Sequence, residues 1–346
     1  MYAGKPQHIK LINEALVRGA LLSQGEATTA ELVAETGLSQ TTVGLIVDQM
    51  WHAGIVREVG KRASKGGRPA SAWVMDPAAW TSIAIAAENE ALHWGVANAL
   101  GALSDRGSRP TAGNPIREAL DLAAELKEAA LVPGRQTRIA LALGLPGAVK
   151  EGKLITGDLR EAWLDVDLSA LFAQRIGLPV VVENDLNAIA LGYAKALDRS
   201  ADKPDSLAYI HFNGGSCIGS GLVFEGRILR GASNYSGELG YLPMGEGKTL
   251  DDLILAVEPD DERYAEAIVR ALQTVNCVVN PALLVLGGRG FRFELEGTIR
   301  ARYEALVDER VRPRLALVPE SLPHYLTGLV GLAADRIFPD FRLTLR

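Results

Sequence analysis

The sequence predicts a small N-terminal α+β module of the winged helix-turn-helix type in residues 1–78 and a larger α/β body in residues 79–346. Two capped helices joined by a tight turn, with a basic hairpin after them, predict the first part. In the body, apolar runs typical of strands alternate with helical patterns, as in α/β domains. Asp76-Pro77 interrupts the pattern, which places the boundary near residue 79.

Helices are expected at three places in the N-terminal module. The first covers residues 9–22, where apolar side chains recur at helical spacing. The second begins with a capping box formed by Thr28 and Glu31 and ends near residue 35. Gly37 can adopt the left-handed conformation that ends a helix, and Ser39 is a good N-cap for a third helix that reaches Met50.

A hairpin with a basic tip follows the third helix. Residues 55–60 alternate between apolar and polar, residues 61–69 are rich in glycine and basic residues, and residues 72–75 make the return strand. Five basic residues fall within twelve positions: Arg57, Lys61, Arg62, Lys65 and Arg68. We expect them to neutralise DNA phosphates, with the thin glycine-rich tip entering the minor groove.

The third helix would lie in the major groove of DNA, and its first exposed turn carries Gln40, Thr41 and Thr42. Glutamine can pair with adenine through two hydrogen bonds, and threonine can contact a base or a thymine methyl group. The pattern leaves open that the helices serve only dimerisation and that the basic loop is a solvated turn. The two signals together favour DNA binding.

Charge and apolar content are consistent with this interpretation. The whole chain carries a net charge of −6, but residues 1–75 hold eight Lys/Arg and six Asp/Glu and are therefore net positive. No apolar run approaches the roughly 20 residues that span a bilayer, and the N-terminus lacks an apolar signal sequence, so we expect a cytoplasmic protein with no membrane partner. Cys217 and Cys277 lack zinc-site spacing and are expected to be buried free thiols.

The body has a regular pattern of expected strands and helices. Strands are expected at residues 82–87, 93–97, 138–143, 180–183, 207–212, 221–224 and 283–286. Helices are expected at residues 116–131, 186–197 and 261–276.

Several strings in both parts resemble the ROK family, which is named for its repressors, open reading frames and kinases. They are Thr36-Gly37-Leu38-Ser39, Gly66-Gly67-Arg68-Pro69-Ala70, Gly144-Leu145-Pro146-Gly147, Glu183-Asn184-Asp185-Leu186-Asn187, Gly237-Glu238-Leu239-Gly240 and Leu286-Gly287-Gly288. The resemblance covers nearly the whole chain and implies an actin-like ATPase or sugar-kinase fold of two lobes, with a cleft between them and a lobe boundary near residues 185–200. One departure is that Gly44 and Leu45 stand where the family's repressors usually have serine and a basic residue.

The resemblance also implies a ligand site made of Gly147, Asn184, Asp185, Glu238 and Tyr241. Asp185 matches the family's catalytic base and Glu238 its acceptor for a sugar hydroxyl. Tyr241 stands where the family has a zinc-binding histidine, and no cysteine occurs in residues 242–259, so we expect neither zinc nor another cofactor. Asn184 or Asp185 could also cap the helix that follows.

The phosphate-binding equipment of the family's kinases is altered. Those kinases begin with an Asp-x-Gly string, whereas this chain has Ala86-Ala87-Glu88-Asn89-Glu90. Glu88 and Glu90 would repel the phosphates of ATP. The second glycine loop, residues 215–221, survives only in part because Cys217 replaces a glycine. We therefore expect that the protein is not an enzyme.

These observations predict a DNA-binding transcriptional regulator, in the first instance a repressor of carbohydrate-related genes. It would bind double-stranded DNA at a palindromic operator as a homodimer or tetramer, and sense a sugar or sugar phosphate in the cleft. Two alternatives stay open: an active carbohydrate kinase with an accessory DNA-binding domain, and a regulator whose body is only a dimerisation platform.

Overall fold

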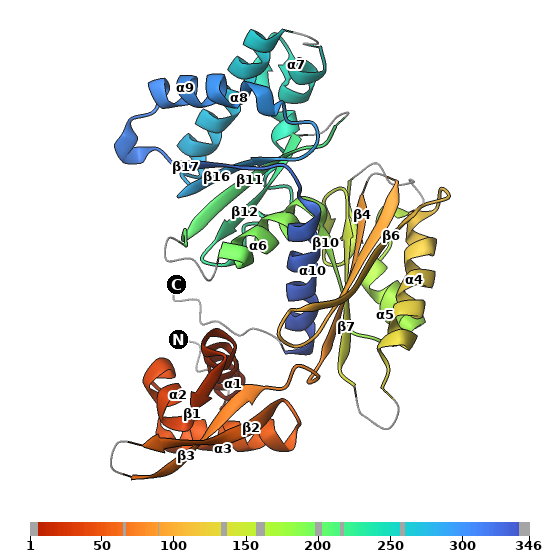
Figure 1. The fold of residues 1–346 in the computed structure, drawn as a ribbon. Coiled ribbons are helices and arrows are strands. Elements are labelled where there is room, and N and C mark those ends of the chain that lie inside the picture. Colours follow the sequence, from red (N-terminus) through yellow and green to blue (C-terminus); the bar gives the residue numbers. More distant parts are fainter. Residues whose placement is uncertain are drawn as a thin grey trace.

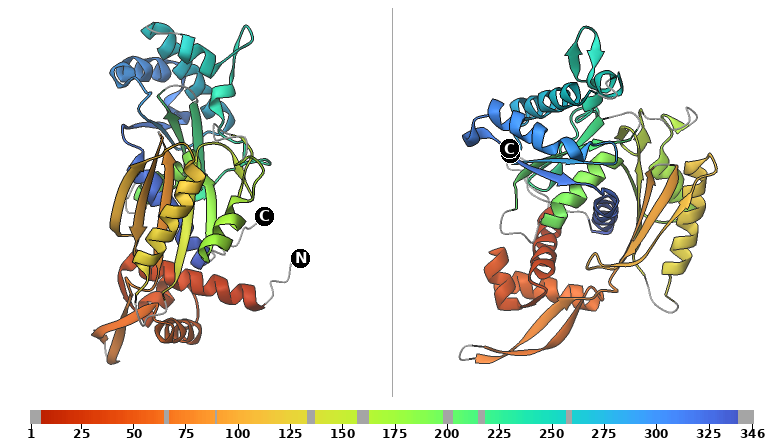
Figure 2. Two further views of the ribbon diagram at one scale, coloured as in Figure 1. Left: turned by 90° about the vertical axis from the view of Figure 1, so that its right-hand side faces the viewer. Right: turned by 45° about the horizontal axis from the view of Figure 1, so that its top comes forward.

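The computed structural model describes residues 6–64, 67–88, 90–132, 137–156, 163–197, 203–214, 218–256 and 260–338. Figure 1 shows a unit of residues 6–75 below a body of two lobes, each built on a five-stranded sheet. The helices α6 (Asp185–Leu197) and α10 (Leu322–Ile337) lie between the two sheets, as the right-hand view in Figure 2 also shows. This is the arrangement of the two-lobed actin-like fold.

The N-terminal unit contains α1 (Pro6–Gln24), α2 (Thr29–Thr36) and α3 (Gln40–His52) beside an antiparallel sheet. Its strands are β1 (Glu26–Thr28), β2 (Val56–Ser64) and β3 (Gly67–Met75), in the order β1-β3-β2. The three helices and the hairpin match the expected elements. The short strand β1 was not expected, because its three residues carry no alternating pattern and are extended only by pairing with β3.

Local capping explains why α2 and α3 begin and end where they do. Thr28 and Glu31 form the expected capping box, in which the Thr28 amide donates to the Glu31 carboxylate at 2.7 Å. Gly37 ends α2 with φ at +67°, in the left-handed region. Ser39 Oγ then accepts the amide of Thr42 at 3.1 Å and starts α3. The turn between the helices is therefore specified at both ends by residues of its own segment.

Lobe one has a mixed sheet in the order β10-β7-β4-β5-β6. Its strands are β4 (Thr81–Glu88), β5 (Ala91–Ala97), β6 (Leu103–Pro110), β7 (Ile139–Leu145) and β10 (Val180–Asn184), with β4, β7 and β10 parallel. The helices α4 (Pro115–Ala130) and α5 (Leu168–Ile176) pack on its outer face, and the hairpin of β8 (Val149–Lys150) and β9 (Lys153–Leu154) follows β7. β6 was not expected, because it is a largely exposed strand with little apolar content at the edge of the sheet.

Lobe two has its sheet in the order β13-β12-β11-β16-β17. The strands are β11 (Ser206–Phe212), β12 (Ile218–Phe224), β13 (Arg227–Ile228), β16 (Leu283–Gly287) and β17 (Arg314–Val318). The helices α8 (Asp261–Val278) and α9 (Glu296–Leu306) cover the outer face. The small hairpin of β14 (Pro243–Gly245) and β15 (Lys248–Thr249) leads into α7 (Leu250–Ala256), and 3₁₀ turns lie at Leu239–Tyr241, Phe293–Leu295 and Glu309–Val311.

Helix α10 joins the two lobes although it comes last in the chain. It packs against α6 and against β4 and β7 of lobe one. Together with the inner strands of lobe two, these elements form one apolar cluster. No helix was expected at residues 322–337 from the sequence. The apolar cluster between the lobes was therefore not predicted.

The N-terminal unit contacts the body through a few specific groups. The Arg138 guanidinium donates to the carbonyl of Ala53 at 3.0 Å. The Arg18 guanidinium lies 4.7 Å from the centre of the Phe338 ring, at the end of α10, and Trp80 packs edge-on against the same ring at 5.0 Å. Trp80 belongs to the buried cluster of the N-terminal unit. The C-terminal end of α10 is therefore part of this junction.

Two further findings concern the expectations on thiols and membranes. Cys277 is exposed, so the expectation of a buried thiol is wrong at this position, which lies near the end of α8 on its outer side. Cys217 lies outside the described residues. Within the described ranges, no helix is both long and apolar enough to cross a membrane.

Candidate functional site

The candidate ligand site is built where β10 ends and α6 begins. Asn184 caps α6, because its Oδ1 accepts the amide of Asn187 at 2.9 Å. Its Nδ2 donates to the Gly147 carbonyl at 2.9 Å and to Asp185 Oδ1 at 2.8 Å. The structure thus brings Gly147, Asn184 and Asp185 together. Asn184 both caps α6 and orients the carboxyl group of Asp185.

Asp185 is the most perturbed acid of this group. Burial raises its pKa to about 7, and the nearby carboxylates of Glu88 and Glu238 add to the rise, while the hydrogen bond from the Leu186 amide opposes it. The carboxyl can therefore change its protonation state near neutral pH. A group of this kind can accept a hydroxyl proton when ionised or donate one when protonated.

Carboxylates from both lobes lie close enough to Asp185 to raise its pKa. Glu88 ends β4 in lobe one, and Glu238 precedes the 3₁₀ turn in lobe two. Burial raises the pKa of Glu88, whereas Arg289 opposes that rise. Burial also raises the pKa of Glu238, with a contribution from Asp251. The site is thus acidic, and Arg289, in the loop after β16, supplies a positive charge beside Glu88.

Sequence reasoning did not identify Arg289 or Tyr325. Tyr325 of α10 is fully buried, and its hydroxyl has no hydrogen-bond partner among the described residues. Its electrostatic environment includes Asp185, Glu88 and Glu183. A Cβ at Gly144 would meet this hydroxyl at 2.4 Å, so the glycine of β7 makes room for it. The Gly287-Gly288-Arg289-Gly290 string could have suggested Arg289, but nothing near Tyr325 in the sequence links it to the site.

Tyr241 is exposed at the end of the 3₁₀ turn that follows Glu238. Its side chain is 65% exposed and its ring lies 5.9 Å from that of Tyr235. The segment after it is held by protein contacts: Leu250 is fully buried, and the Thr249 amide donates to the Asp252 carboxylate at 2.8 Å. Over the described ranges, no three His, Cys, Asp or Glu side chains are grouped to hold a metal ion. The residues present do not fit the zinc site of the family's kinases.

The string that we expected at the position of the kinase phosphate loop begins at the end of β4. Ala86 is fully buried in the apolar cluster between the lobes. Glu88 lies next to the Asp185 site, and Glu90 is exposed with φ at +56°. Asn89 and residues 215–217 of the second glycine loop lie outside the described residues.

The predicted DNA-contacting residues of α3 divide into two kinds. Gln40 and Thr41 are exposed on its first turn. Thr42 is half-buried, and its hydroxyl is hydrogen-bonded to Ser39 Oγ at 2.8 Å. We therefore regard Gln40 and Thr41 as the residues available to a base, and Thr42 as part of the cap.

The basic residues of the hairpin also differ from one another. Arg57 and Lys61 on β2 are exposed, and neither forms an ion pair within the described part of the chain. Arg62 is paired with Glu26 at 2.9 Å and with Glu31 at 3.3 Å, which directs it toward α2. Lys65 lies outside the described residues, as does the side chain of Arg68.

Comparison with known proteins identifies the body. Residues 83–253, from β4 to α7, match the model of the ROK family. This part of the chain is therefore similar to the ROK family. Among curated relatives of this domain, the xylose repressor of Bacillus subtilis is 24% identical over 237 residues, which are 68% of this chain and 61% of the relative. A putative xylose repressor of a Caldicellulosiruptor species is 29% identical over 241 residues, 68% and 59% of the two chains.

Curated sugar kinases match over a shorter stretch. The N-acetyl-D-glucosamine kinase of Aliivibrio salmonicida is 37% identical over 105 residues, 29% of this chain and 32% of the kinase. The matches to the repressors are longer, but this chain spans only about 60% of the length of those repressors.

Solved structures show the same fold. A ROK family transcriptional regulator, described as a homologue of the E. coli MLC protein, superposes with a TM-score of 0.76 at 18% identity. That match covers 96% of this chain and 99% of the regulator, so it includes most of residues 6–75. The ROK hexokinase from Thermus thermophilus gives a TM-score of 0.55 at 20% identity and covers 72% of this chain.

Proposed function

We propose that this chain is a sugar-responsive transcriptional repressor, in which residues 1–78 form a winged helix-turn-helix domain that binds operator DNA and residues 79–346 form a ROK domain that binds the sugar. The observation that carries the proposal is the extent of the structural match. The regulator's fold covers 96% of this chain, whereas the hexokinase covers 72%. The additional unit is the one with the capped helix pair and the basic hairpin.

The DNA-binding role is supported by the exposed groups of the N-terminal unit. Gln40 and Thr41 stand on the first turn of the second helix of the pair, which is the part that reads base edges in this class of domain. Arg57 and Lys61 extend along the adjacent hairpin and are free to contact phosphates. Two such units in a homodimer would match the two halves of a palindromic operator.

The sugar-sensing role rests on the group around Asn184 and on the names of the relatives. Glu88 of lobe one and Glu238 of lobe two both lie close enough to Asp185 to raise its pKa, so a ligand bound among the three would contact both lobes. Carboxylate oxygens accept hydrogen bonds from sugar hydroxyls. Xylose is the first candidate ligand, because several relatives are named xylose repressors. Lobe movement could then reach the N-terminal unit through α10.

Kinase activity is not part of the proposal. Among the described residues at this position, Ala86 is buried and Glu88 is a carboxylate that would repel the phosphates of ATP, although Arg289 lies nearby. Incubation with ATP and xylose or glucose should therefore yield no sugar phosphate and no ADP. Turnover of either sugar would favour the kinase alternative.

The experiment that tests the proposed function is a DNA pull-down with the full-length protein, followed by mobility-shift titration of the recovered sites. We expect palindromic sites whose binding weakens steeply with salt, and we expect xylose to reduce the affinity. Failure to enrich any DNA would contradict the DNA-binding role. If DNA is enriched but no sugar changes its affinity, only the sensing role would be contradicted. That result would favour a body that serves as a dimerisation platform.

A prediction for the sugar site follows from the protonation of Asp185. Because its pKa is about 7, the Asp185 carboxyl group becomes ionised as pH rises through neutrality. An ionised carboxylate accepts stronger hydrogen bonds than a neutral carboxyl group. We expect xylose affinity, measured by calorimetry, to increase about tenfold between roughly pH 6 and pH 8. Asp185→Asn should remove this dependence and keep the affinity low at both pH values.

The same variant provides a control on folding. The Asp185 carboxyl group has a pKa of about 4 in the unfolded chain and about 7 in the native protein. The native protein therefore holds a proton that the unfolded chain has released between these pH values. As pH rises through this range, Asp185 lowers the free energy of unfolding. Asp185→Asn should therefore be at least as stable as the wild type at neutral pH. Wild-type affinity for xylose in a folded Asp185→Asn variant would place the sugar elsewhere.

A further inference from the structure

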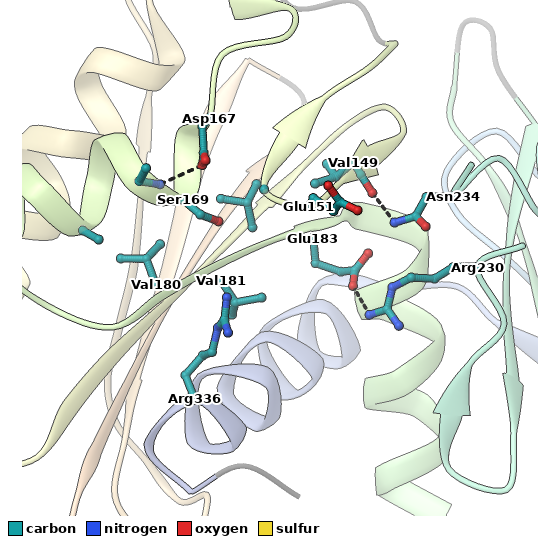
Figure 3. A pocket seen from close by; sticks show the side chains of 14 residues that line it. Val149, Glu151, Asp167, Ser169, Val180, Val181, Glu183, Arg230, Asn234 and Arg336 are labelled. Atoms are coloured by element: carbon teal, nitrogen blue, oxygen red, sulfur yellow. Dashed lines mark hydrogen bonds and ion pairs between the residues drawn. The ribbon is translucent and has the colours of Figure 1, made fainter. Parts of the chain in front are cut away.

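A pocket of about 540 Å³ lies beside β10, and Figure 3 shows it from close by. Its volume is within the range of small-molecule sites in proteins. None of the candidate sugar residues, Gly147, Asn184, Asp185, Glu238 and Tyr241, lines it. The pocket is therefore distinct from the site proposed for the sugar.

Three parts of the fold meet at this pocket. The β8–β9 hairpin, the start of α5 and strand β10 provide the lobe-one side. Arg230 and Asn234 come from lobe two, in the segment after β13, and Arg336 comes from α10. Arg230 donates to the Glu183 carboxylate, and Asn234 Nδ2 donates to the Val149 carbonyl, so the two lobes are joined at this edge (Figure 3).

Several charged groups that line the pocket are already compensated. The Glu183 side chain is only 4% exposed and is paired with Arg230. Asp167 caps α5, since its Oδ1 accepts the amide of Ala170 at 2.8 Å. Two groups remain: Glu151 and Arg336 are exposed, and within the described ranges neither forms an ion pair. The open groups of the pocket are therefore one guanidinium and one carboxylate, with the Ser169 hydroxyl beside them.

We propose that this pocket binds a small polyhydroxylated monocarboxylic acid, of the sugar-acid class. Arg336 pairs with the carboxylate of the ligand, and Glu151 and Ser169 accept hydrogen bonds from its hydroxyl groups. One uncompensated guanidinium matches a single negative charge. A phosphate dianion is disfavoured because Glu151 and Asp167 would repel it, and a neutral sugar would leave Arg336 without a partner.

The position of the pocket gives the ligand a measurable effect on stability. A bound molecule would contact lobe one, lobe two and α10 at once, and a ligand that binds only the folded state raises the melting temperature. The probe is D-glucuronate, which carries one carboxylate and several hydroxyl groups. D-glucose is the matched neutral probe, since it has the same ring without the charge.

The experiment is a thermal-shift titration of the full-length protein with both probes, up to concentrations on the order of 10 mM. To exclude binding in the cleft, it is performed in the Asp185→Asn background. We expect glucuronate to raise the melting temperature there and glucose to have no effect. Arg336→Gln in that background should weaken glucuronate binding at least about tenfold, because it removes a charge-assisted hydrogen bond.

The control variant is Arg175→Gln, which removes an exposed arginine of α5 that does not line the pocket. It should leave the glucuronate response unchanged. The proposal is overturned if glucuronate gives no shift in the Asp185→Asn background, or if Arg336→Gln in that background retains the full shift. These outcomes are independent of DNA binding and so do not depend on the proposed function.

Discussion

Replacing Gly192 or Gly328 by alanine should destabilise the body by about 3 kcal/mol or more, because α6 and α10 approach too closely for an added methyl group. A Cβ at Gly192 would lie 1.8 Å from the carbonyl oxygen of His324. A Cβ at Gly328 would lie 1.9 Å from that of Ala188. Both contacts are with backbone atoms, so the helices would have to move apart and open the apolar cluster between the lobes.

The measurement is the melting temperature and solubility of each variant beside two glycine-to-alanine controls. At Gly331 on α10, the nearest atom to an added Cβ is the end of the Lys195 side chain, which can move away. At Gly297 on α9, nothing lies within 4 Å. Both control substitutions should be neutral or stabilise by up to about 1 kcal/mol, since alanine favours helices. Wild-type stability of Gly192→Ala would show that α6 and α10 are not packed in this way.

Removing both free positive charges of β2 should weaken DNA binding by about tenfold to a hundredfold at physiological salt. The double variant Arg57→Ala/Lys61→Ala loses two groups available to phosphates in each subunit, so the slope of log affinity against log salt should fall by about 4 for a homodimer on its operator. Mobility-shift titrations at several salt concentrations measure both quantities. Because phosphates carry no sequence information, the loss should be similar for specific and unrelated DNA.

Two comparisons sharpen this result. Arg62→Ala should change the salt slope less than Lys61→Ala, because Arg62 is engaged by Glu26 and Glu31. Arg175→Ala/Lys248→Ala, which removes two exposed charges from the body, should leave DNA affinity unchanged. Gln40→Ala should instead relax the base preference at one operator position. An unaltered slope in Arg57→Ala/Lys61→Ala would mean that the hairpin does not lie on the phosphate backbone.

Elements whose signals lie within a few residues were predictable. The capping box of Thr28 and Glu31, the left-handed Gly37 and the Ser39 cap each depend on neighbours in sequence, and the structure contains all of them. The expected buried strands of the body are also present, because continuous apolar runs are typical of strands covered on both faces. Polar edge strands such as β6 lack that signal and were missed.

Of the candidate site, only the sequence motif was predictable. The string from Glu183 to Asn187 indicated the group at the end of β10, and the hydrogen bonds of Asn184 bear out its closeness to Gly147 and Asp185. The prediction that Arg62 faces DNA could not take into account its pairing with Glu26 and Glu31, because that pairing depends on how the hairpin packs on α2.

The N-terminal helices and hairpin, the strands of the body and the Asn184-Asp185 motif follow from local signals, because caps, turns and periodicity act over neighbouring residues. The contacts between distant residues come from the folded arrangement of the elements. That arrangement placed α10 against α6 through Gly192 and Gly328, brought Arg289 beside Glu88, and left Arg336 unpaired in the pocket within the described part of the chain. Such contacts join segments far apart in the sequence, so no local pattern encodes them.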